Sequence, residues 1–167
     1  MTWGASNPRE PFSGIKRSLT DGGVRVPFLV RWKGRAQPGR TSEHVGSLAD
    51  WFATAAQLAQ APVEVPADSV SILPEILGNQ QPRHEFLYWE FHERDFTQAA
   101  LYQGRWKGIR SGAPDAPVVV YDQQEDPSET NNVAHLHPDV ALKISDYLKT
   151  ARVDSPDWPA TWKKRIP

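Results

Sequence analysis

Proline restricts the folding of this chain more than any other residue type. The sequence has 15 prolines among 167 residues, about 9% against a typical ~5%. Because proline fixes φ and lacks an amide donor, this number of prolines forces many turns and leaves room for few long helices. A chain of this length suits one domain, or one domain with a small appendage, and is long enough to bury a core.

Composition and charge exclude several classes of protein. Hydrophobic residues make up 39% and charged residues 23%, which is typical of globular domains rather than disordered chains. The formal charge of −1 gives no electrostatic reason to expect nucleic acid or an anionic membrane as a partner. The sequence has no cysteine, which excludes disulfides, thiolate metal ligands and cysteine nucleophiles within it. No apolar run approaches the ~20 residues of a membrane span, and residues 1–20 lack an apolar signal-peptide core.

The second half of the chain is typical of a small antiparallel sheet followed by a helix. Residues 86–92 alternate between apolar and polar side chains, as in a strand, and residues 99–102 and 106–110 predict a hairpin. Residues 117–122 predict another strand. Pro138 stands at the favoured first position of a helix over about 138–152, whose apolar residues recur at helical spacing.

The first half predicts fewer elements. Residues 1–25 are polar and rich in turn residues, which favours a loop. Residues 26–32 form a short apolar run typical of a buried strand. Residues 45–61 have helical spacing, with Ser47 and Asp50 as a capping pair near the start. A buried strand needs neighbours on both sides, and this half does not supply them, so part of the sheet is expected outside this chain.

Together these elements predict an α+β fold. A partial α/β lobe, with one strand and one helix, comes first, and a small antiparallel sheet packed by a C-terminal helix follows. A boundary near Pro82 divides the chain into one domain at 1–82 and a second at 83–167.

General catalytic motifs are missing from the sequence. Neither glycine-rich phosphate-binding pattern occurs, nor does the G-x-S-x-G of serine hydrolases. His135 and His137 have the spacing of a metal-binding pair, but a surface or capping role is favoured because they precede a helix. The end of the strand at 86–92 carries a polar cluster, for which a solvated strand tip is the simpler interpretation. The cluster comprises Glu90, His92, Glu93 and Asp95.

The most informative stretch spans residues 14–27. Lys16 stands in a glycine-flanked loop that leads into the predicted strand, so its ammonium can point into a cleft and bind an anion such as sulfate or phosphate. Gly22 and Gly23 allow the backbone to take φ > 0, and Arg25 is expected to tie the loop by several hydrogen bonds. The alternative is that Lys16 and its basic neighbour form an ordinary solvated charge pair.

This stretch resembles the type I sulfatases, the formylglycine-dependent arylsulfatases of the alkaline-phosphatase-like superfamily. The family pattern is Gly-x-Lys, then Glu-Gly-Gly-x-Arg-x-Pro, an apolar strand and Trp-Pro-Gly. The chain matches this pattern at Gly14, Lys16, Gly22, Gly23, Arg25 and Pro27. Asp21 replaces the family's Glu, and Lys33 departs from its usual Pro.

Further segments, in the same order as in the family, are similar to other sulfatase motifs. They are residues 48–54, 68–74, 87–91, 104–107 and 121–132. The last two contain the family's Gly-x-Trp-Lys and its Asp-Pro-x-Glu-x-x-Asn. The resemblance covers residues 4 to about 155, so the first domain is similar to the end of the sulfatase α/β lobe.

The resemblance implies a parent protein that hydrolyses sulfate esters with calcium and formylglycine. The family makes its formylglycine from Cys or Ser in a Cys/Ser-x-Pro-x-Arg motif; Ser6 has the wrong spacing and position. Thr2 and Trp3 stand where the last calcium ligands would be, so no metal ligand is expected in this chain. The chain is therefore expected to be a C-terminal sulfatase fragment that is inactive alone. A periplasmic or secreted location would apply to the parent.

The resemblance also assigns roles and partners. Lys16 is expected to contact the substrate sulfate, and His92 and Glu93 to lie on the substrate side of the pocket. The substrate class is a sulfated small molecule or a sulfated sugar. One alternative is a non-catalytic binding or assembly module, because an unpaired strand at 26–32 favours self-association or pairing with a missing N-terminal segment. Another is a truncated remnant without function.

Overall fold

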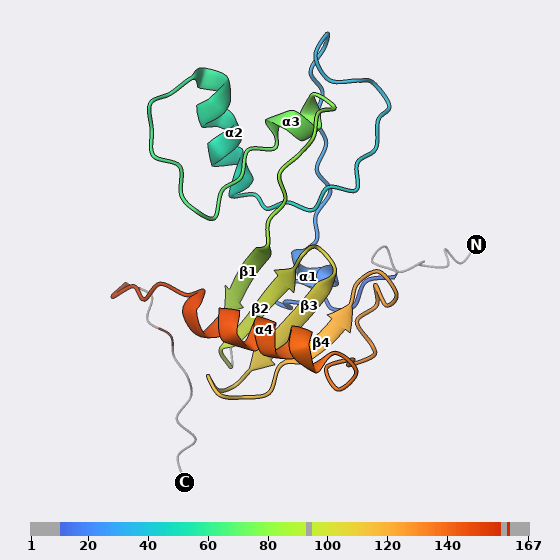
Figure 1. Cartoon of the computed structure of the whole chain (residues 1–167), viewed down its shortest axis with the longest axis vertical. Helices are drawn as coiled ribbons and strands as arrows, with labels where there is room; N and C mark the ends of the chain where they lie inside the picture. The colour runs from blue at the N-terminus through green and yellow to red at the C-terminus, as the bar shows by residue number, and fades with distance from the viewer. Residues whose placement is uncertain (1–10, 93–94, 158–159, 161–167) are drawn as a thin grey trace, which may run out of the picture. The chain divides into compact units, whose positions relative to one another are not determined.

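The contacts of the chain group its residues into two units (Figure 1). The computed structural model describes residues 11–92, 95–157 and 160. Residues 26–87 form the middle unit, and residues 1–25 together with 88–167 form the sheet unit. The sequence instead predicted a single division near residue 82. Within the described parts of the chain, no helix combines the length and the apolar character needed to cross a membrane.

A four-stranded antiparallel sheet in the order β1-β2-β3-β4 is the base of the sheet unit. Its strands are β1 (Phe86–Phe91), whose first two residues fall in the middle unit, β2 (Thr97–Tyr102), β3 (Trp106–Ser111) and β4 (Val119–Asp122). The β2-β3 turn is tight because Gln103 and Gly104 both have positive φ, +52° and +68°. These strands confirm the sheet and the hairpin that the sequence predicted.

The helix α4 (Pro138–Thr150) covers one face of this sheet (Figure 1). Its buried residues Val140, Ile144 and Leu148 recur every four positions, so they form one stripe. A Cβ at Gly108 of β3 would lie 2.4 Å from the Ile144 side chain, so only glycine permits this close approach. The helix was predicted correctly from its apolar spacing, and it ends at Thr150.

The opposite face is covered by residues 13–25, which we call the lysine loop because it contains Lys16. Leu19 of this loop is buried and packs with Ala99 and Ile109 of the sheet. The loop includes α1 (Asp21–Val24), a single helical turn where the sequence predicted only irregular structure. Burial of Leu19 explains why this part of the chain groups with the second half.

A buried lysine of β3 ties the lysine loop to the sheet. Lys107 is 0% exposed, and its Nζ lies 2.8 Å from Asp21 Oδ1 and 3.5 Å from Glu129 Oε1. The Asp21 amide donates to Glu129 Oε2 at 2.7 Å, and the Gln123 side-chain amide donates to Glu129 Oε1 at 2.9 Å. One cation therefore joins three segments that are distant in sequence.

The middle unit contains two helices, α2 (Asp50–Ala59) and α3 (Leu73–Ile76). The predicted capping pair forms only in part: the Ser47 amide donates to Asp50 Oδ2 at 2.7 Å, but the N-cap residue is Ala49 and makes no side-chain cap hydrogen bond. The helix begins at Asp50, and Gln60, with φ of +52°, ends it. The helix is therefore shorter at both ends than the predicted range of 45–61.

The strand predicted at 26–32 is wrong for this chain as it stands. These residues are extended but form no strand, and Val26, Phe28, Leu29 and Val30 are exposed rather than buried. The physical reason is that a strand exists only when it hydrogen-bonds to a neighbour, and no neighbour lies beside this segment in the described chain.

Replacing the buried cation tests the connection between loop and sheet. Lys107→Met removes the ammonium that pairs with the buried Glu129 carboxyl and with the partly buried Asp21, so we expect the free energy of unfolding to fall by about 3–5 kcal/mol in urea titrations. As a control, Lys149→Met removes an exposed lysine that pairs with Asp146. This substitution should change the free energy of unfolding by no more than ~0.5 kcal/mol. Equal effects of the two substitutions would contradict the structural role of Lys107.

The Glu129 carboxyl makes the stability of this cluster depend on pH. Burial raises the pKa of Glu129 above its ordinary value of 4.5, although Lys107 and the Asp21 amide act in the opposite direction. The folded chain therefore binds a proton at pH values where the unfolded chain has lost it. The resulting stabilisation is full below pH 4.5 and is lost as the pH rises through the raised pKa.

We therefore expect wild type to gain stability relative to Glu129→Gln as the pH falls through the raised pKa toward 4.5. The glutamine variant keeps the shape of the side chain but cannot titrate, so it serves as the reference in chemical unfolding at each pH. A difference that grows as the pH rises would mean that Lys107 lowers the pKa of Glu129, contrary to the expected direction.

Candidate functional site

Lys16 lies at the tip of a β-turn in the lysine loop. The Ser18 amide donates to the Ile15 carbonyl at 2.9 Å, so Lys16 and Arg17 are the two central residues of the turn. Arg17 has φ of +80°, a value that a type II turn requires at this position and that glycine usually supplies. Both side chains are exposed. The turn thus presents Lys16 to solvent on a strained backbone, a feature found often at functional sites.

The base of this turn is closed by short backbone contacts. The Gly22 amide and the Thr20 hydroxyl both donate to the Ser13 carbonyl, at 2.7 and 2.9 Å. A Cβ at Gly22 would lie 2.4 Å from this carbonyl oxygen, and one at Gly23 would lie 2.1 Å from the Ser18 carbonyl oxygen. The glycines are needed for space, so the prediction that they provide positive φ is wrong.

Arg25 supports the loop less extensively than the sequence predicted. Its side chain is 59% exposed, lies 3.6 Å from Asp21 Oδ2 and stacks over the Phe12 ring at 4.4 Å. The backbone amide of Arg25, rather than its guanidinium, makes the close hydrogen bond, 2.9 Å to the Asp21 carbonyl. The expected set of several side-chain hydrogen bonds is therefore reduced to one ion pair and one ring contact.

A small polar hollow of about 240 Å³ adjoins the turn. Hydroxyl groups and one guanidinium gather around it, which are groups that donate hydrogen bonds to oxyanions. The polar residues in its lining are Arg17, Ser18, Thr20, Thr97 and Ser111. Lys16 directly precedes Arg17 in the sequence but does not line the hollow.

His92 lies in a different cluster, at the end of β1. Its Nε2 is 3.0 Å from Glu90 Oε1, while the Tyr88 hydroxyl donates to Glu90 Oε2 at 2.8 Å. Burial acts to raise the pKa of Glu90, but hydrogen bonds from His92 and Tyr88 and the charge of Arg152 outweigh it and hold the pKa below 4.5. Glu93, the other expected substrate-side residue, lies outside the described residues.

The described residues do not fit a calcium site. No group of three or more His, Cys, Asp or Glu side chains in the described chain is arranged to hold a metal ion. Asp21 and Glu129 come together, but the Lys107 ammonium stands between their carboxylates. His137 precedes α4 and packs on the Trp106 ring at 4.5 Å. Ser6, the one serine that came near the formylglycine pattern, lies outside the described residues, and the sequence has no cysteine.

Sequence reasoning missed the anchor of the lysine loop. Lys107 and Glu129 were noted only as parts of matching motifs, and their contact with Asp21 was not foreseen. The available signal was a lysine on the apolar face of β3, two positions from Ile109, because alternate residues of a strand face the same side. A lysine in such a position must be paired to be buried.

Comparisons with known proteins identify the family of the chain. Residues 14–154 match the family model described as N-sulphoglucosamine sulphohydrolase, C-terminal. The chain is 30% identical to an N-acetylgalactosamine-6-O-sulfatase of Bacteroides thetaiotaomicron over 162 residues, which are 87% of this chain and 30% of that protein. It is 42% identical to the steryl-sulfatase of Mus musculus over 100 residues, covering 57% of this chain and 15% of that protein.

A solved structure shows the same fold. It was described in work on the metabolism of multiple glycosaminoglycans by Bacteroides thetaiotaomicron, and it matches with a TM-score of 0.71 and 30% identity. The match covers 84% of this chain and 32% of the solved one. The chain thus spans about a third or less of the length of these relatives. It belongs to the family of C-terminal sulfatase domains within the alkaline-phosphatase-like superfamily.

Proposed function

We propose that this chain is the C-terminal part of a sulfate ester hydrolase and that Lys16 binds the sulfate group of the substrate. Its membership of the sulfatase family supports the reaction class. The position of Lys16, exposed at the tip of a turn whose base is closed by hydrogen bonds, supports the residue role.

The main observation in support of this proposal is that the turn bearing Lys16 is anchored to the sheet unit. Leu19 is buried in the core, and Asp21 is held by the buried Lys107. The backbone that bears Lys16 is therefore fixed before any substrate arrives. A fixed cation stabilises negative charge on sulfate oxygens at little cost of reorganisation as the ester bond breaks.

The role of this chain in catalysis is electrostatic. Its described residues provide neither a calcium site nor a formylglycine precursor, so the nucleophile and the metal belong to other parts of the parent enzyme. Lys16 is a compact point charge, which suits sulfate oxygens without demanding one planar geometry. The isolated chain is accordingly expected to bind sulfate without hydrolysing its esters.

Sulfated sugars are the substrate class that we favour. The relative that covers 87% of this chain is named for N-acetylgalactosamine-6-O-sulfate hydrolysis, which supports a sulfated amino sugar. His92 would contact the sugar, because Glu90 holds its ring at the end of β1. Glu93, which follows it directly in the sequence, is proposed as a second substrate-binding residue.

A second candidate function, a binding or assembly module, is favoured by one observation. The middle unit exposes many large apolar side chains to solvent. This feature is compatible with the first proposal, since a sulfatase domain must also contact the rest of its enzyme.

Substitution of Lys16 tests the sulfate-binding role. In NMR titrations of the full chain with inorganic sulfate and with N-acetylgalactosamine 6-sulfate, Lys16→Ala should weaken binding of both ligands by a factor of about 10 to 100, since a hydrogen bond to a charged group contributes ~1.5–3 kcal/mol. Lys16→Arg keeps the charge and should retain most of the affinity. Lys149→Ala removes an exposed lysine elsewhere in the sheet unit and should have no effect.

Unchanged affinity in Lys16→Ala would remove Lys16 from the site. The same samples can be assayed with a chromogenic aryl sulfate, for which we expect no turnover. Metal-dependent hydrolysis by the pure chain would contradict the view that the nucleophile and metal lie elsewhere.

A further inference from the structure

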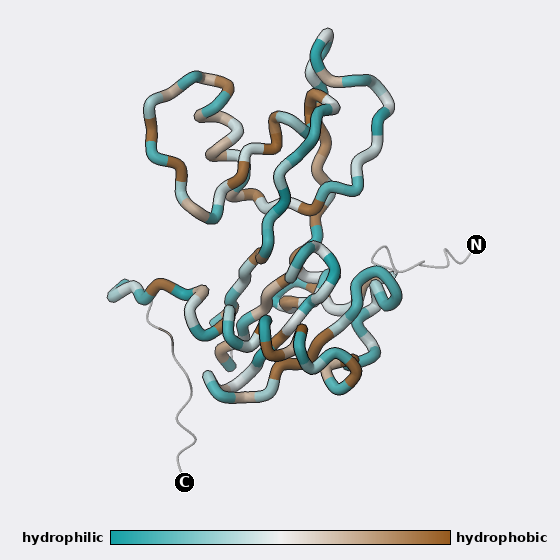
Figure 2. The backbone as a smooth tube through the Cα atoms, in the orientation of Figure 1, coloured by the Kyte–Doolittle hydropathy of each residue, from teal (hydrophilic) through white to brown (hydrophobic). Residues whose placement is uncertain are grey.

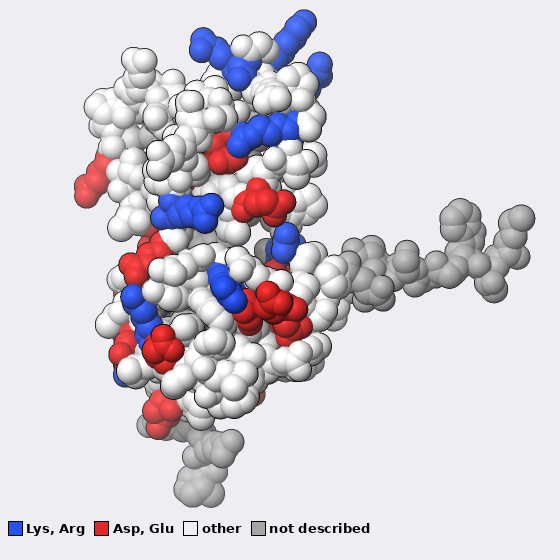
Figure 3. Space-filling view, turned by 45° about the vertical axis from the view of Figure 1, so that its right-hand side comes forward, with Lys and Arg blue, Asp and Glu red and all other residues white. Residues whose placement is uncertain are grey.

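The loop at residues 31–40, which we call the basic loop, concentrates positive charge in the middle unit. Arg31, Lys33, Arg35 and Arg40 lie in it, and the sequence has no acidic residue from position 22 to position 42. Because the whole chain has a formal charge of −1, this charge is local rather than a result of composition. Figure 3 shows Lys and Arg side chains gathered over one end of the middle unit. Such a concentration of one sign attracts ions of the other.

One cation of the basic loop is paired, and it fixes the loop within the middle unit. The Arg40 guanidinium donates to the carbonyl and to the carboxylate of Glu75 in α3. A hydrogen bond from Ser42 and the charge of Arg40 hold the pKa of Glu75 below its ordinary value of 4.5. The Glu75 carboxylate therefore stays ionised at neutral pH, and Arg40 positions the loop rather than adding to its unpaired charge.

The other three cations of the basic loop have no carboxylate partner. Arg31, Lys33 and Arg35 are exposed, and none of them forms an ion pair within the part of the chain that the structure describes. Like charges at alternate positions of a short segment repel one another. An anion bound between them would relieve this repulsion, so the loop is better suited to a bound anion than to solvent alone.

The backbone that carries these cations is a closed turn. The amides of Arg35 and Ala36 both donate to the Trp32 carbonyl, at 3.0 and 2.9 Å, and Gly34 has φ of +77°. The Arg35 guanidinium lies 5.9 Å from the centre of the Trp32 ring. A guanidinium that packs on a ring by its face can still donate hydrogen bonds from its edge. Arg35 is thus restrained in a position from which it can bind an oxyanion.

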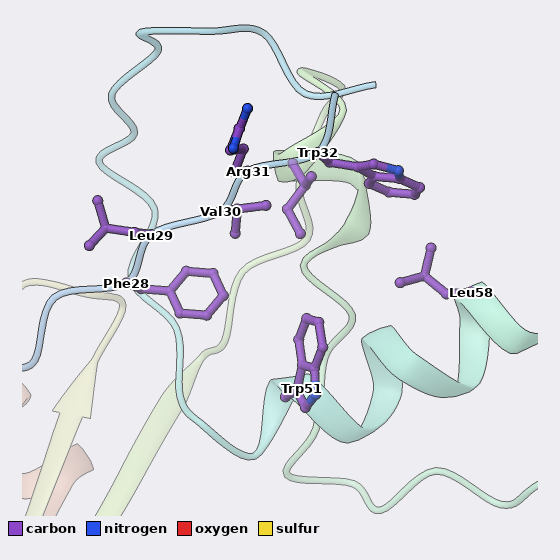
Figure 4. Close-up of a pocket in the computed structure, with 8 residues that line it drawn as sticks. Phe28, Leu29, Val30, Arg31, Trp32, Trp51 and Leu58 are labelled. Carbon is purple, nitrogen blue, oxygen red and sulfur yellow. The ribbon is translucent and has the colours of Figure 1, made fainter. Parts of the chain in front are cut away.

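The basic loop differs in chemistry from the apolar segment that precedes it. Figure 2 shows the loop in hydrophilic and neutral colours, without the hydrophobic stretches found elsewhere in the middle unit. Arg31 and Trp32 also line a hollow of about 450 Å³ beside α2, where most other lining residues are apolar, such as Phe28 and Trp51 (Figure 4). Arg31 therefore lies at the boundary, and the surface suited to a hydrated polyanion begins at Lys33.

We propose that the basic loop binds a chain of sulfated polysaccharide, at a surface that does not include Lys16. Lys33 and Arg35 make the main contacts, and Arg31 adds to them. A linear polyanion carries its sulfates at intervals, so separate cations can bind several of them at once. Arginine donates to two sulfate oxygens from its planar fork, and lysine acts as a point charge.

The choice of a polysaccharide rests on the proposed function, in which the substrate is a sulfated sugar. A second contact with the same polysaccharide raises the effective concentration of its sulfated units near the enzyme, without any change at the catalytic centre. The basic loop would therefore favour long substrates over single sugars.

NMR titration of the full, isotope-labelled chain with a chondroitin 6-sulfate octasaccharide tests this surface. This ligand contains N-acetylgalactosamine 6-sulfate within a polyanionic chain, and the monosaccharide N-acetylgalactosamine 6-sulfate serves as the reference. At about 50 mM salt we expect the octasaccharide to bind roughly tenfold more tightly than the monosaccharide and to shift the amides of residues 33–37. Its affinity should fall as the salt concentration rises, because salt screens exposed charges.

Three variants make the result specific. Lys33→Ala/Arg35→Ala should weaken octasaccharide binding about five- to tenfold, flatten its salt dependence and leave monosaccharide binding unchanged. Lys33→Arg/Arg35→Lys keeps both charges and should retain most of the affinity. Lys149→Ala removes an exposed lysine of α4 and should have no effect.

The same titrations distinguish the basic loop from the sulfate-binding role of Lys16. If Lys16→Ala has no effect but Lys33→Ala/Arg35→Ala weakens octasaccharide binding, the role of Lys16 fails and the loop proposal stands. Equal octasaccharide affinity of wild type and Lys33→Ala/Arg35→Ala would overturn the loop proposal, as would equal affinity for octasaccharide and monosaccharide. Tighter binding of a DNA duplex with the same number of charges would also overturn it, because the loop would then be a nucleic-acid surface.

Discussion

The buried ammonium of Lys107 is the interaction on which the sheet unit depends. Burying a charge is costly unless it is paired, and here two carboxylates from distant segments pair with it. One of them, Asp21, belongs to the lysine loop, and the other, Glu129, accepts a hydrogen bond from the Asp21 amide. The loop is therefore fixed by a polar cluster in addition to the burial of Leu19.

The two units are stabilised by different interactions. The sheet unit packs α4 on one face of its sheet, close enough that Gly108 has no room for a side chain, and packs Leu19 on the other. The middle unit relies on the hydrogen bonds of Asp50 and Ser69 and leaves its aromatic residues in solvent. The first arrangement produces a packed core, and the second leaves large apolar side chains exposed.

The sequence predicted those features that depend on neighbours in the chain. The apolar stripe of α4 and the turn at Gly104 are local patterns, and both elements formed where expected. Residues 26–32 have the pattern of a strand, but strand formation needs a partner that the pattern cannot supply. The role of Lys107 could not be deduced, because its two carboxylates lie 86 and 22 positions away and only folding brings them together.

The candidate site was only partly predictable for the same reason. Lys16 could be singled out by its glycine-flanked loop and its sulfatase-like motif, and the structure does place it exposed on a closed turn. The reason for the neighbouring glycines was different from the one expected, since carbonyl oxygens crowd Gly22 and Gly23. Such crowding depends on how the loop closes on itself, which a residue-by-residue interpretation does not reveal.

Hydrogen exchange of the Asp21 and Gly22 amides in the full chain is the most direct test of this account. These amides donate to the Glu129 carboxylate and the Ser13 carbonyl, so the account predicts that they exchange only when the sheet unfolds, at rates matching the amides of β3. Rapid exchange at the rate of an open loop would show that the turn bearing Lys16 is not anchored, and would contradict the proposal that Lys16 is a fixed sulfate-binding cation.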